Sequence, residues 1–83
     1  MPREAGATKQ KILDAAERLF ARKGFHGVSI RDITALANVD VALANYHFGP
    51  KKNLLATVIE RRAQVLNDER LHLLDEARRA RRR

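Results

Sequence analysis

The chain has 83 residues, so its length allows no more than one small domain. It contains no Cys, which excludes a disulfide framework or a thiolate metal site, and its apolar runs are too short to span a membrane. Its net charge is +7, but five of its arginines lie in the last six residues, and such an end is commonly a solvated tail, so the charge favours a polyanionic partner only weakly.

The first predicted element is a helix from Lys9 to Lys23. The chain has only two Pro and four Gly and shows no period-two alternation, which predicts an all-α fold. Thr8 is a suitable N-cap, and Gly24 stands where a left-handed residue commonly ends a helix. The apolar stripe of this helix consists of Ile12, Leu13, Ala16, Leu19 and Phe20.

A second, short helix is predicted from Ile30 to Ala37. Ser29 is followed three residues later by Asp32, a pattern that resembles a capping box, so the helix is expected to start there. Asn38 tolerates the left-handed conformation and is expected to end the helix in a tight turn. The residues expected on its inner face are Ile30, Ile33, Leu36 and Ala37.

A third helix follows directly, from Val41 to His47, with Asp40 as its N-cap. Gly49 and Pro50 then break the chain, and Pro is well tolerated at the start of a further helix. The first three helices are therefore expected to form a small bundle that is joined by a short break to a fourth helix.

The fourth helix is predicted to begin at Lys51. Asn67 and Asp68 are expected to interrupt it, because both are good caps and poor interior residues, and a fifth helix would then run from Glu69 to about Arg79. One continuous helix from Lys51 is the alternative. The apolar residues of the fourth helix are Leu54, Leu55, Val58, Ile59, Ala63 and Leu66.

The two short helices and the turn between them have the layout of a helix-turn-helix. In such a unit the second helix lies in the major groove of DNA. An ordinary corner of a helical bundle has the same layout, so the helix pattern alone leaves both interpretations open.

Cations at the predicted helix starts favour the DNA interpretation. Lys51 and Lys52 occupy a first turn, where the helix macrodipole makes each cation unfavourable by roughly 0.3–1 kcal/mol. A docked anion would explain why they are tolerated. Lys9 and Arg31 are expected at the starts of the first and second helices, where free backbone N–H groups also bind phosphates. Solvated surface charge is the simpler alternative for any single one of them.

The third helix carries an apolar run from Val41 to Ala44, so one of its faces must be exposed unless it meets a partner. Val, Ala and Leu side chains can contact thymine methyl groups, and Asn45 can form paired hydrogen bonds with adenine. Tyr46 and His47 can donate to phosphates. Half-buried packing of Tyr46 or His47 is the structural alternative.

The region from Thr8 to Leu55 resembles the N-terminal DNA-binding domain of the TetR family of bacterial transcriptional regulators. The resemblance rests on Ile12-Leu13-Asp14-Ala15-Ala16, Leu19-Phe20, Lys23-Gly24-Phe25, Val28-Ser29-Ile30-Arg31-Asp32-Ile33 and Asn45-Tyr46-His47-Phe48-Gly49-Pro50-Lys51. It implies a homeodomain-like three-helix domain over residues 1–52, followed over residues 53–83 by a connecting helix and the start of a regulatory domain. Asn38 stands where the family usually has Gly, and Pro50 replaces a capping Ser.

The resemblance also implies roles for individual residues. The residues that would face the bases are Val41, Ala42, Leu43 and Asn45. The cations at the helix starts are added to this set for contacts with the DNA backbone. The residues that would contact phosphates are then Thr8, Lys9, Ser29, Arg31, Tyr46, His47 and Lys51.

Family members act mostly as repressors in the bacterial cytoplasm, where they bind a palindromic operator in the nucleoid as homodimers. A larger C-terminal domain binds a small-molecule inducer. The chain is expected to stop in the first helix of that domain, as a truncated product would, so its inducer site is absent or incomplete. Its expected partner is double-stranded DNA, without a membrane, a cofactor or a metal ion.

Two rival classes compete with a DNA-binding regulator. The leucines after Lys52 fit a helical protein-interaction module, and the arginine tail fits a cationic peptide that binds RNA or a membrane surface. An enzyme is not expected, because the sequence has no Gly-rich phosphate loop and its three His, at positions 26, 47 and 72, lack the spacing of metal ligands.

Overall fold

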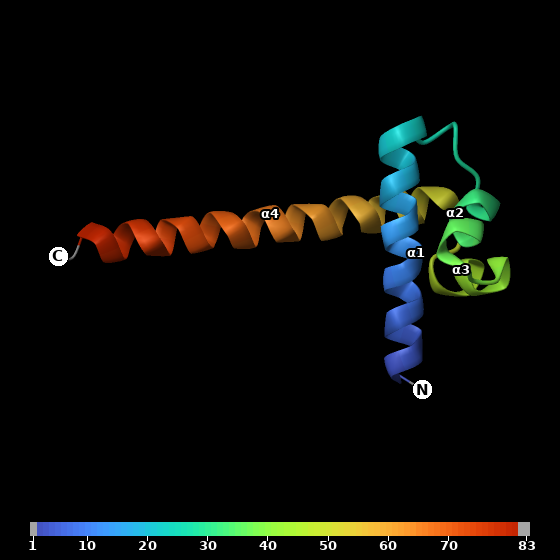
Figure 1. Cartoon of the computed structure of the whole chain (residues 1–83), viewed down its shortest axis with the longest axis horizontal. Helices are drawn as coiled ribbons and strands as arrows, with labels where there is room; N and C mark the ends of the chain where they lie inside the picture. Colours follow the sequence, from blue (N-terminus) through green and yellow to red (C-terminus); the bar gives the residue numbers. More distant parts are fainter. Residues whose placement is uncertain (1, 82–83) are drawn as a thin grey trace.

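The computed structural model describes the backbone of residues 2–81 and the side chains of residues 6–81. It contains the four helices α1 (Pro2–Lys23), α2 (Ile30–Ala37), α3 (Val41–His47) and α4 (Lys51–Arg81). The first three helices and the beginning of α4, which crosses α1, form a bundle, and the rest of α4 projects from it as a long arm (Figure 1). The described part of the chain is therefore all-α, as predicted.

Helix α1 is longer than predicted. It begins at Pro2 instead of Lys9, so Thr8 lies inside the helix and is not its N-cap. Pro is readily accommodated in a first helical turn, and a single Gly, here Gly6, costs a helix only about 1 kcal/mol. The end of the helix is as predicted, because Gly24 adopts a φ of 77°.

The predicted caps of the two short helices are confirmed. The Ser29 hydroxyl accepts a hydrogen bond from the Asp32 backbone N–H at 3.1 Å, and the Ser29 N–H donates to the Asp32 carboxylate at 2.9 Å. Asn38 is left-handed, with φ 57° and ψ 47°. The Asp40 carboxylate accepts from the backbone N–H of Ala42 at 3.0 Å. These local interactions fix where α2 ends and α3 begins.

The core lies where α1 crosses the other three helices. Its buried apolar residues are Ile12, Leu13, Ala15, Ala16, Val28, Ile33, Ala44, Leu54 and Val58. Thr34 is also buried, and its hydroxyl donates to the carbonyl oxygens of Ile30 and Arg31. Leu36 was predicted to face inward but is 48% exposed, because the buried arc of α2 runs through positions 30, 33, 34 and 37 and leaves position 36 at its edge.

Helix α4 continues without a break through Asn67 and Asp68, so the predicted separate fifth helix is wrong and the continuous alternative is confirmed for residues 51–81. Two unfavourable residues cost a helix only a few tenths of a kcal/mol each, roughly, which does not stop an established helix. The Gln64 amide also donates to the Asp68 carboxylate one turn later, at 3.2 Å.

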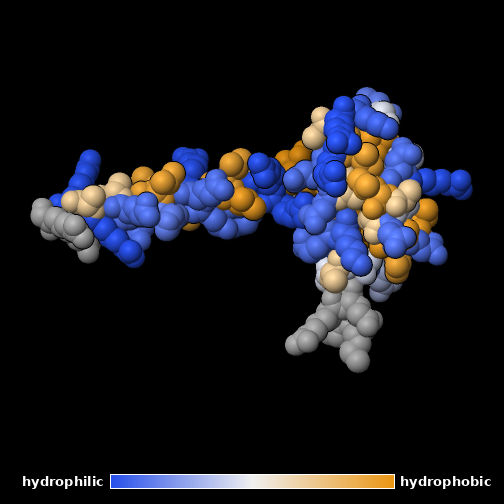
Figure 2. All heavy atoms as spheres, in the orientation of Figure 1, coloured by the Kyte–Doolittle hydropathy of each residue, from blue (hydrophilic) through white to orange (hydrophobic). Residues whose placement is uncertain are grey.

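The arm carries apolar side chains in contact with solvent. Arg61 is the last half-buried residue of α4, and every described residue after it is exposed. Figure 2 shows apolar residues on the arm as well as on the bundle. None of the helices within residues 2–81 is long and apolar enough to cross a membrane.

Candidate nucleic-acid interface

Helix α3 presents its apolar run to solvent. Only Ala44 is buried, at 1% exposure, and it anchors the helix on the core. Ala42, Leu43 and Asn45 are exposed, and Val41 is half-buried at the edge of the same surface. An exposed helix face made of Ala, Leu and Asn carries side chains that can contact base edges in a major groove.

Packing and hydrogen bonds hold α3 rigidly against α2. The backbone N–H of Val39 donates to the Thr34 carbonyl at 3.0 Å, and that of Asn38 donates to the Ala35 carbonyl at 3.2 Å. The side chain of Val39 is partly buried against the core, and Phe48 packs there from the end of α3. The turn between the helices is therefore a fixed corner, as the sequence predicts.

Two aromatic residues flank the exposed face of α3 at its C-terminal end. Tyr46 is 82% exposed, so the alternative of half-buried packing is wrong for this residue. His47 is half-buried, with its ring between those of Tyr46 and Phe48 at centroid distances of 5.1 Å and 6.3 Å. The phenol of Tyr46 is free to reach a ligand beside α3.

The start of α2 already has its own anionic cap. Asp32 accepts the backbone N–H of Ser29, and this bond, followed by the bond with the Ser29 hydroxyl, holds the pKa of Asp32 below its usual value of 3.8. The capping box predicted from the sequence thus occupies the backbone N–H groups of Ser29 and Asp32, which are not available to a phosphate. Arg31, which is exposed, is the cation that remains available at this helix start.

Lys51 has an architectural role that the sequence did not reveal. Its ammonium group donates to the carbonyl oxygens of Phe25 at 2.7 Å and Val28 at 2.8 Å, and it lies 4.2 Å from the centroid of the Phe25 ring. These contacts tie the start of α4 to the loop between α1 and α2. They explain a cation in the first turn of α4 without a docked anion, whereas Lys52 is exposed.

The cations of α1 are not at a helix start. Lys9 and Lys11 are exposed, and Thr8 is half-buried, in the interior of a helix that begins at Pro2. The predicted pairing of Lys9 with free backbone N–H groups at a helix start is therefore wrong. Their charges remain available to an anionic ligand, but only through their side chains.

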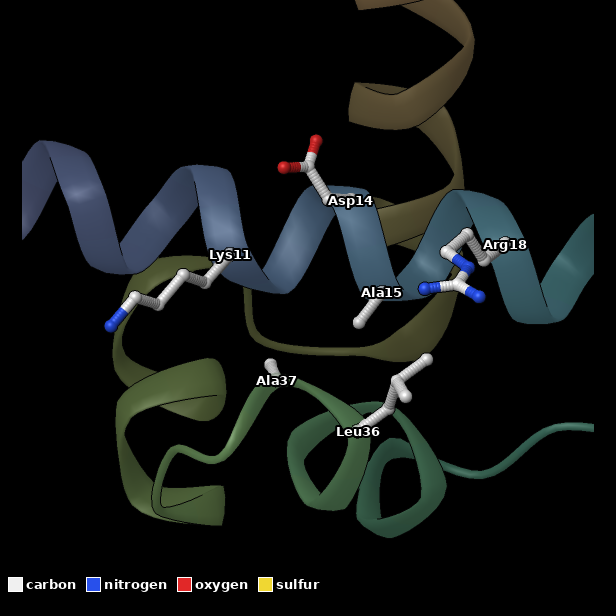
Figure 3. A pocket seen from close by; sticks show the side chains of 6 residues that line it. All are labelled: Lys11, Asp14, Ala15, Arg18, Leu36 and Ala37. Atoms are coloured by element: carbon white, nitrogen blue, oxygen red, sulfur yellow. The ribbon is translucent and has the colours of Figure 1, made fainter.

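A shallow hollow of about 280 Å³ lies between α1 and α2 (Figure 3). Ala15 and Ala37 leave the space that forms it, and Leu36 lines its α2 side. Lys11 and Arg18 lie at its rim, whereas Asp14 points away from α2. No residue of α3 lines it, so this hollow is separate from the exposed face of α3.

One cluster of polar and charged side chains, formed by Arg61 of α4 and residues of α1, was not predicted from the sequence. The Arg61 guanidinium bonds to side chains of α1 that lie 44 to 51 residues earlier in the chain. Their spacing on one face of α1 is the only trace of this contact in the sequence. Among the described residues, no group of three or more His, Asp or Glu side chains is placed to hold a metal ion.

A tight corner between α2 and α3, with the face of the second helix left open, defines the helix-turn-helix class. A family model described as bacterial regulatory proteins, tetR family, matches residues 12–58. The chain belongs to this family, which confirms the resemblance seen in the sequence.

Individual relatives agree with this assignment. The chain is 42% identical over 53 residues to the probable HTH-type transcriptional regulator YttP of Bacillus subtilis, covering 64% of this chain and 26% of that protein. It is 37% identical over 57 residues to the HTH-type transcriptional repressor NicS of Pseudomonas putida, covering 69% and 27%. The chain thus spans about a quarter of the length of these curated relatives.

A solved structure shows the same fold. A crystal structure of a mutant HlyIIR protein superposes with a TM-score of 0.66 at 39% sequence identity, covering 68% of this chain and 31% of that one.

A third sequence relative is IcaR of Staphylococcus aureus, described as a negative transcriptional regulator of the biofilm operon icaADBC. It is 41% identical over 46 residues, covering 55% of this chain and 25% of that protein.

Proposed function

We propose that this chain binds duplex DNA in a sequence-specific manner, with α3 in the major groove, and represses transcription. The observation that supports it best is the open face of α3, where apolar side chains and Asn45 are exposed next to a corner fixed by buried residues. A rigid corner with an exposed reading face suits a major groove, whose edges offer methyl groups and paired hydrogen-bonding groups.

The base contacts would come from four residues of α3. Ala42 and Leu43 would contact thymine methyl groups, and Val41 would do so from the edge of the surface. Asn45 would accept from N6 and donate to N7 of an adenine. A bidentate contact of this kind discriminates against a wrong base by about 1–3 kcal/mol.

The phosphate contacts would come from side chains around α3. Tyr46 and His47 would donate at one end of the helix, and Ser29 and Arg31 would donate from the start of α2. Thr8 and Lys9 would contact the backbone from α1. Lys51 keeps one N–H of its ammonium group for a phosphate, since the other two have carbonyl acceptors.

In the whole protein, two copies would bind a palindromic operator, with the two α3 helices in successive major grooves roughly 34–36 Å apart. Dimer contacts and an inducer site would belong largely to a regulatory part outside these 83 residues. This function would place the protein at the nucleoid, in the bacterial cytoplasm.

Selection of bound sequences from a random duplex pool tests this function. We expect a consensus with A·T pairs, and Asn45→Ala should reduce discrimination at one adenine position by about 1–3 kcal/mol. Asn67→Ala, an exposed amide on the α4 arm and far from α3, is the matched control and should leave the consensus unchanged. An unchanged consensus for Asn45→Ala would show that α3 is wrongly oriented.

Salt dependence separates phosphate contacts from a protein-interaction role. Affinity for the selected duplex should fall on a log–log scale with a slope of about −0.9 per neutralised phosphate. Tight self-association without DNA affinity would favour the interaction module instead. Loss of all DNA affinity on deletion of residues 78–83 alone would favour the cationic-tail interpretation.

A further inference from the structure

The geometry points to Arg61 as a positioning residue: we propose that its guanidinium fixes the direction of the α4 arm relative to α1. The guanidinium contacts three side chains of α1 at once. Nη1 donates to Gln10 Oε1 at 2.9 Å and to Asp14 Oδ1 at 2.8 Å, and Nη2 lies 3.5 Å from Glu17 Oε1. Because the guanidinium group is planar and bonds to several acceptors at once, it restrains the orientation of α4 relative to α1 as well as the distance between them.

The three acceptors form a polar stripe on the face of α1 that meets α4. Gln10, Asp14 and Glu17 are spaced four and three residues apart, so they lie on one side of the helix. Asp14 points away from the hollow between α1 and α2 (Figure 3), and its carboxylate reaches Arg61. The stripe spans about 10 Å of α1, because each helical residue rises about 1.5 Å.

Arg61 stands at the point where α4 leaves the bundle. Val58 and Leu54, about one and two turns earlier, are buried. The Arg61 side chain is 25% exposed, and all described residues from position 62 onward are exposed. The apolar contacts before Arg61 hold α4 against α1, and the Arg61 guanidinium makes the last hydrogen bonds between the described parts of α4 and α1. Beyond it, Arg62 and Val65 only line a shallow hollow beside Glu17 of α1.

The arm converts a small change of angle into a large displacement. The part of α4 after Arg61 that the structure describes is about 30 Å long, so a rotation of about 10° at Arg61 moves its tip by about 5 Å. The angle itself is a property of this chain and does not depend on DNA. Its consequence for the separation of two α3 helices rests on the proposed function.

Distances between spin labels test the proposal directly. The chain has no Cys, so Arg22→Cys and Ala77→Cys introduce two labelling sites, one near the end of α1 and one on the arm. Position 77 lies about 24 Å beyond Arg61, so we expect the Arg61→Gln variant to broaden or shift the 22–77 distance distribution by up to about 4 Å for a rotation of about 10°. Arg70→Gln, the same change at an exposed position further along the arm, should leave it unchanged.

Charge reversal separates a specific contact from general destabilisation. Asp14→Arg and Arg61→Glu should each broaden the distribution, and the double variant should narrow it again. Arg61→Lys should give an intermediate width, because an ammonium group lacks the planar fork. A label pair at positions 22 and 35 reports on the bundle alone and should not change in any variant.

If the substitutions at Arg61 unfold the bundle, a salt titration of the unsubstituted Arg61 protein still tests whether its ionic contacts hold the arm. With Arg61 intact, raising KCl from about 0.05 M to about 1 M should broaden the 22–77 distribution but not the 22–35 distribution. A 22–77 distribution that is insensitive to salt would overturn the proposal, as would an Arg61→Glu variant with an intact bundle and the wild-type distribution. Neither result would bear on whether α3 binds DNA.

Discussion

Replacing Lys51 with Met tests whether this cation is part of the architecture. The Met side chain keeps an apolar stem but loses the ammonium group that donates to the carbonyl oxygens of Phe25 and Val28. Hydrogen bonds to charged groups contribute about 1.5–3 kcal/mol, and the half-buried position of Lys51 reduces that contribution by hydration. We expect the free energy of unfolding to fall by about 2 kcal/mol, which corresponds to a Tm lower by roughly 8–16 °C.

Urea denaturation followed by circular dichroism measures this loss, with Lys52→Met as the matched control. Both variants remove a cation from the first turn of α4, so the gain of roughly 0.3–1 kcal/mol from the macrodipole is common to the two. Lys52 is exposed, so its replacement should change stability by that gain alone, about 1 kcal/mol at most. Equal stabilities of the two variants would refute the architectural role of Lys51.

Two further predictions concern the caps of α2. Asn38 has a φ of 57°, a left-handed conformation that strains an Ala side chain but not a Gly. In thermal denaturation, Asn38→Ala should therefore lower the free energy of unfolding by about 1–2 kcal/mol, whereas Asn38→Gly should change it by only a few tenths of a kcal/mol. Equal effects of the two substitutions would contradict this backbone strain. The Ser29 N–H and hydroxyl lower the pKa of Asp32, so the stabilisation by its carboxylate is complete above the usual value of 3.8 and is lost as pH falls through the lower folded-state pKa. The stability difference between wild type and Asp32→Ala should therefore shrink in acid, and a difference independent of pH would rule this out.

The caps could be predicted because their partners are close in sequence. Ser29 and Asp32 are three residues apart, and the Asp40 cap bonds to a backbone group two residues away. Residue type and spacing are sufficient to specify such bonds. The left-handed turn at Asn38 is predictable for the same reason, since few residue types tolerate that conformation.

Helix lengths were harder to predict because they depend on small differences in propensity. The sequence suggested a start near Lys9 and a break at Asn67, but the helices run through both positions. Each unfavourable residue changes the free energy of helix formation by less than about 1 kcal/mol, and propagation of an existing helix outweighs a cost of that size. A residue that can cap a helix therefore allows the helix to begin or end there but does not require it.

The exposed face of α3 was predictable from its composition, but the roles of the cations were not. A run of four apolar residues in a helix of seven cannot be buried on all sides, and the structure exposes Ala42 and Leu43 while Ala44 is buried. Lys51 instead bonds to groups 23 and 26 residues earlier, and Arg61 bonds to groups 44 to 51 residues earlier. Contacts of such separation depend on how the helices pack, which local patterns do not specify.

The two long-range cations hold the same helix at two points. Lys51 fastens the start of α4 to the loop between α1 and α2, and Arg61 fastens it to α1 about 15 Å further along. Between them, Leu54 and Val58 are buried in the core that also contains Ala44 of α3. The first ten residues of α4 and helix α3 are therefore packed into one core. We expect a force on the arm to shift α3 by turning this core as a unit, unless the force first breaks the Arg61 contacts and lets the arm rotate.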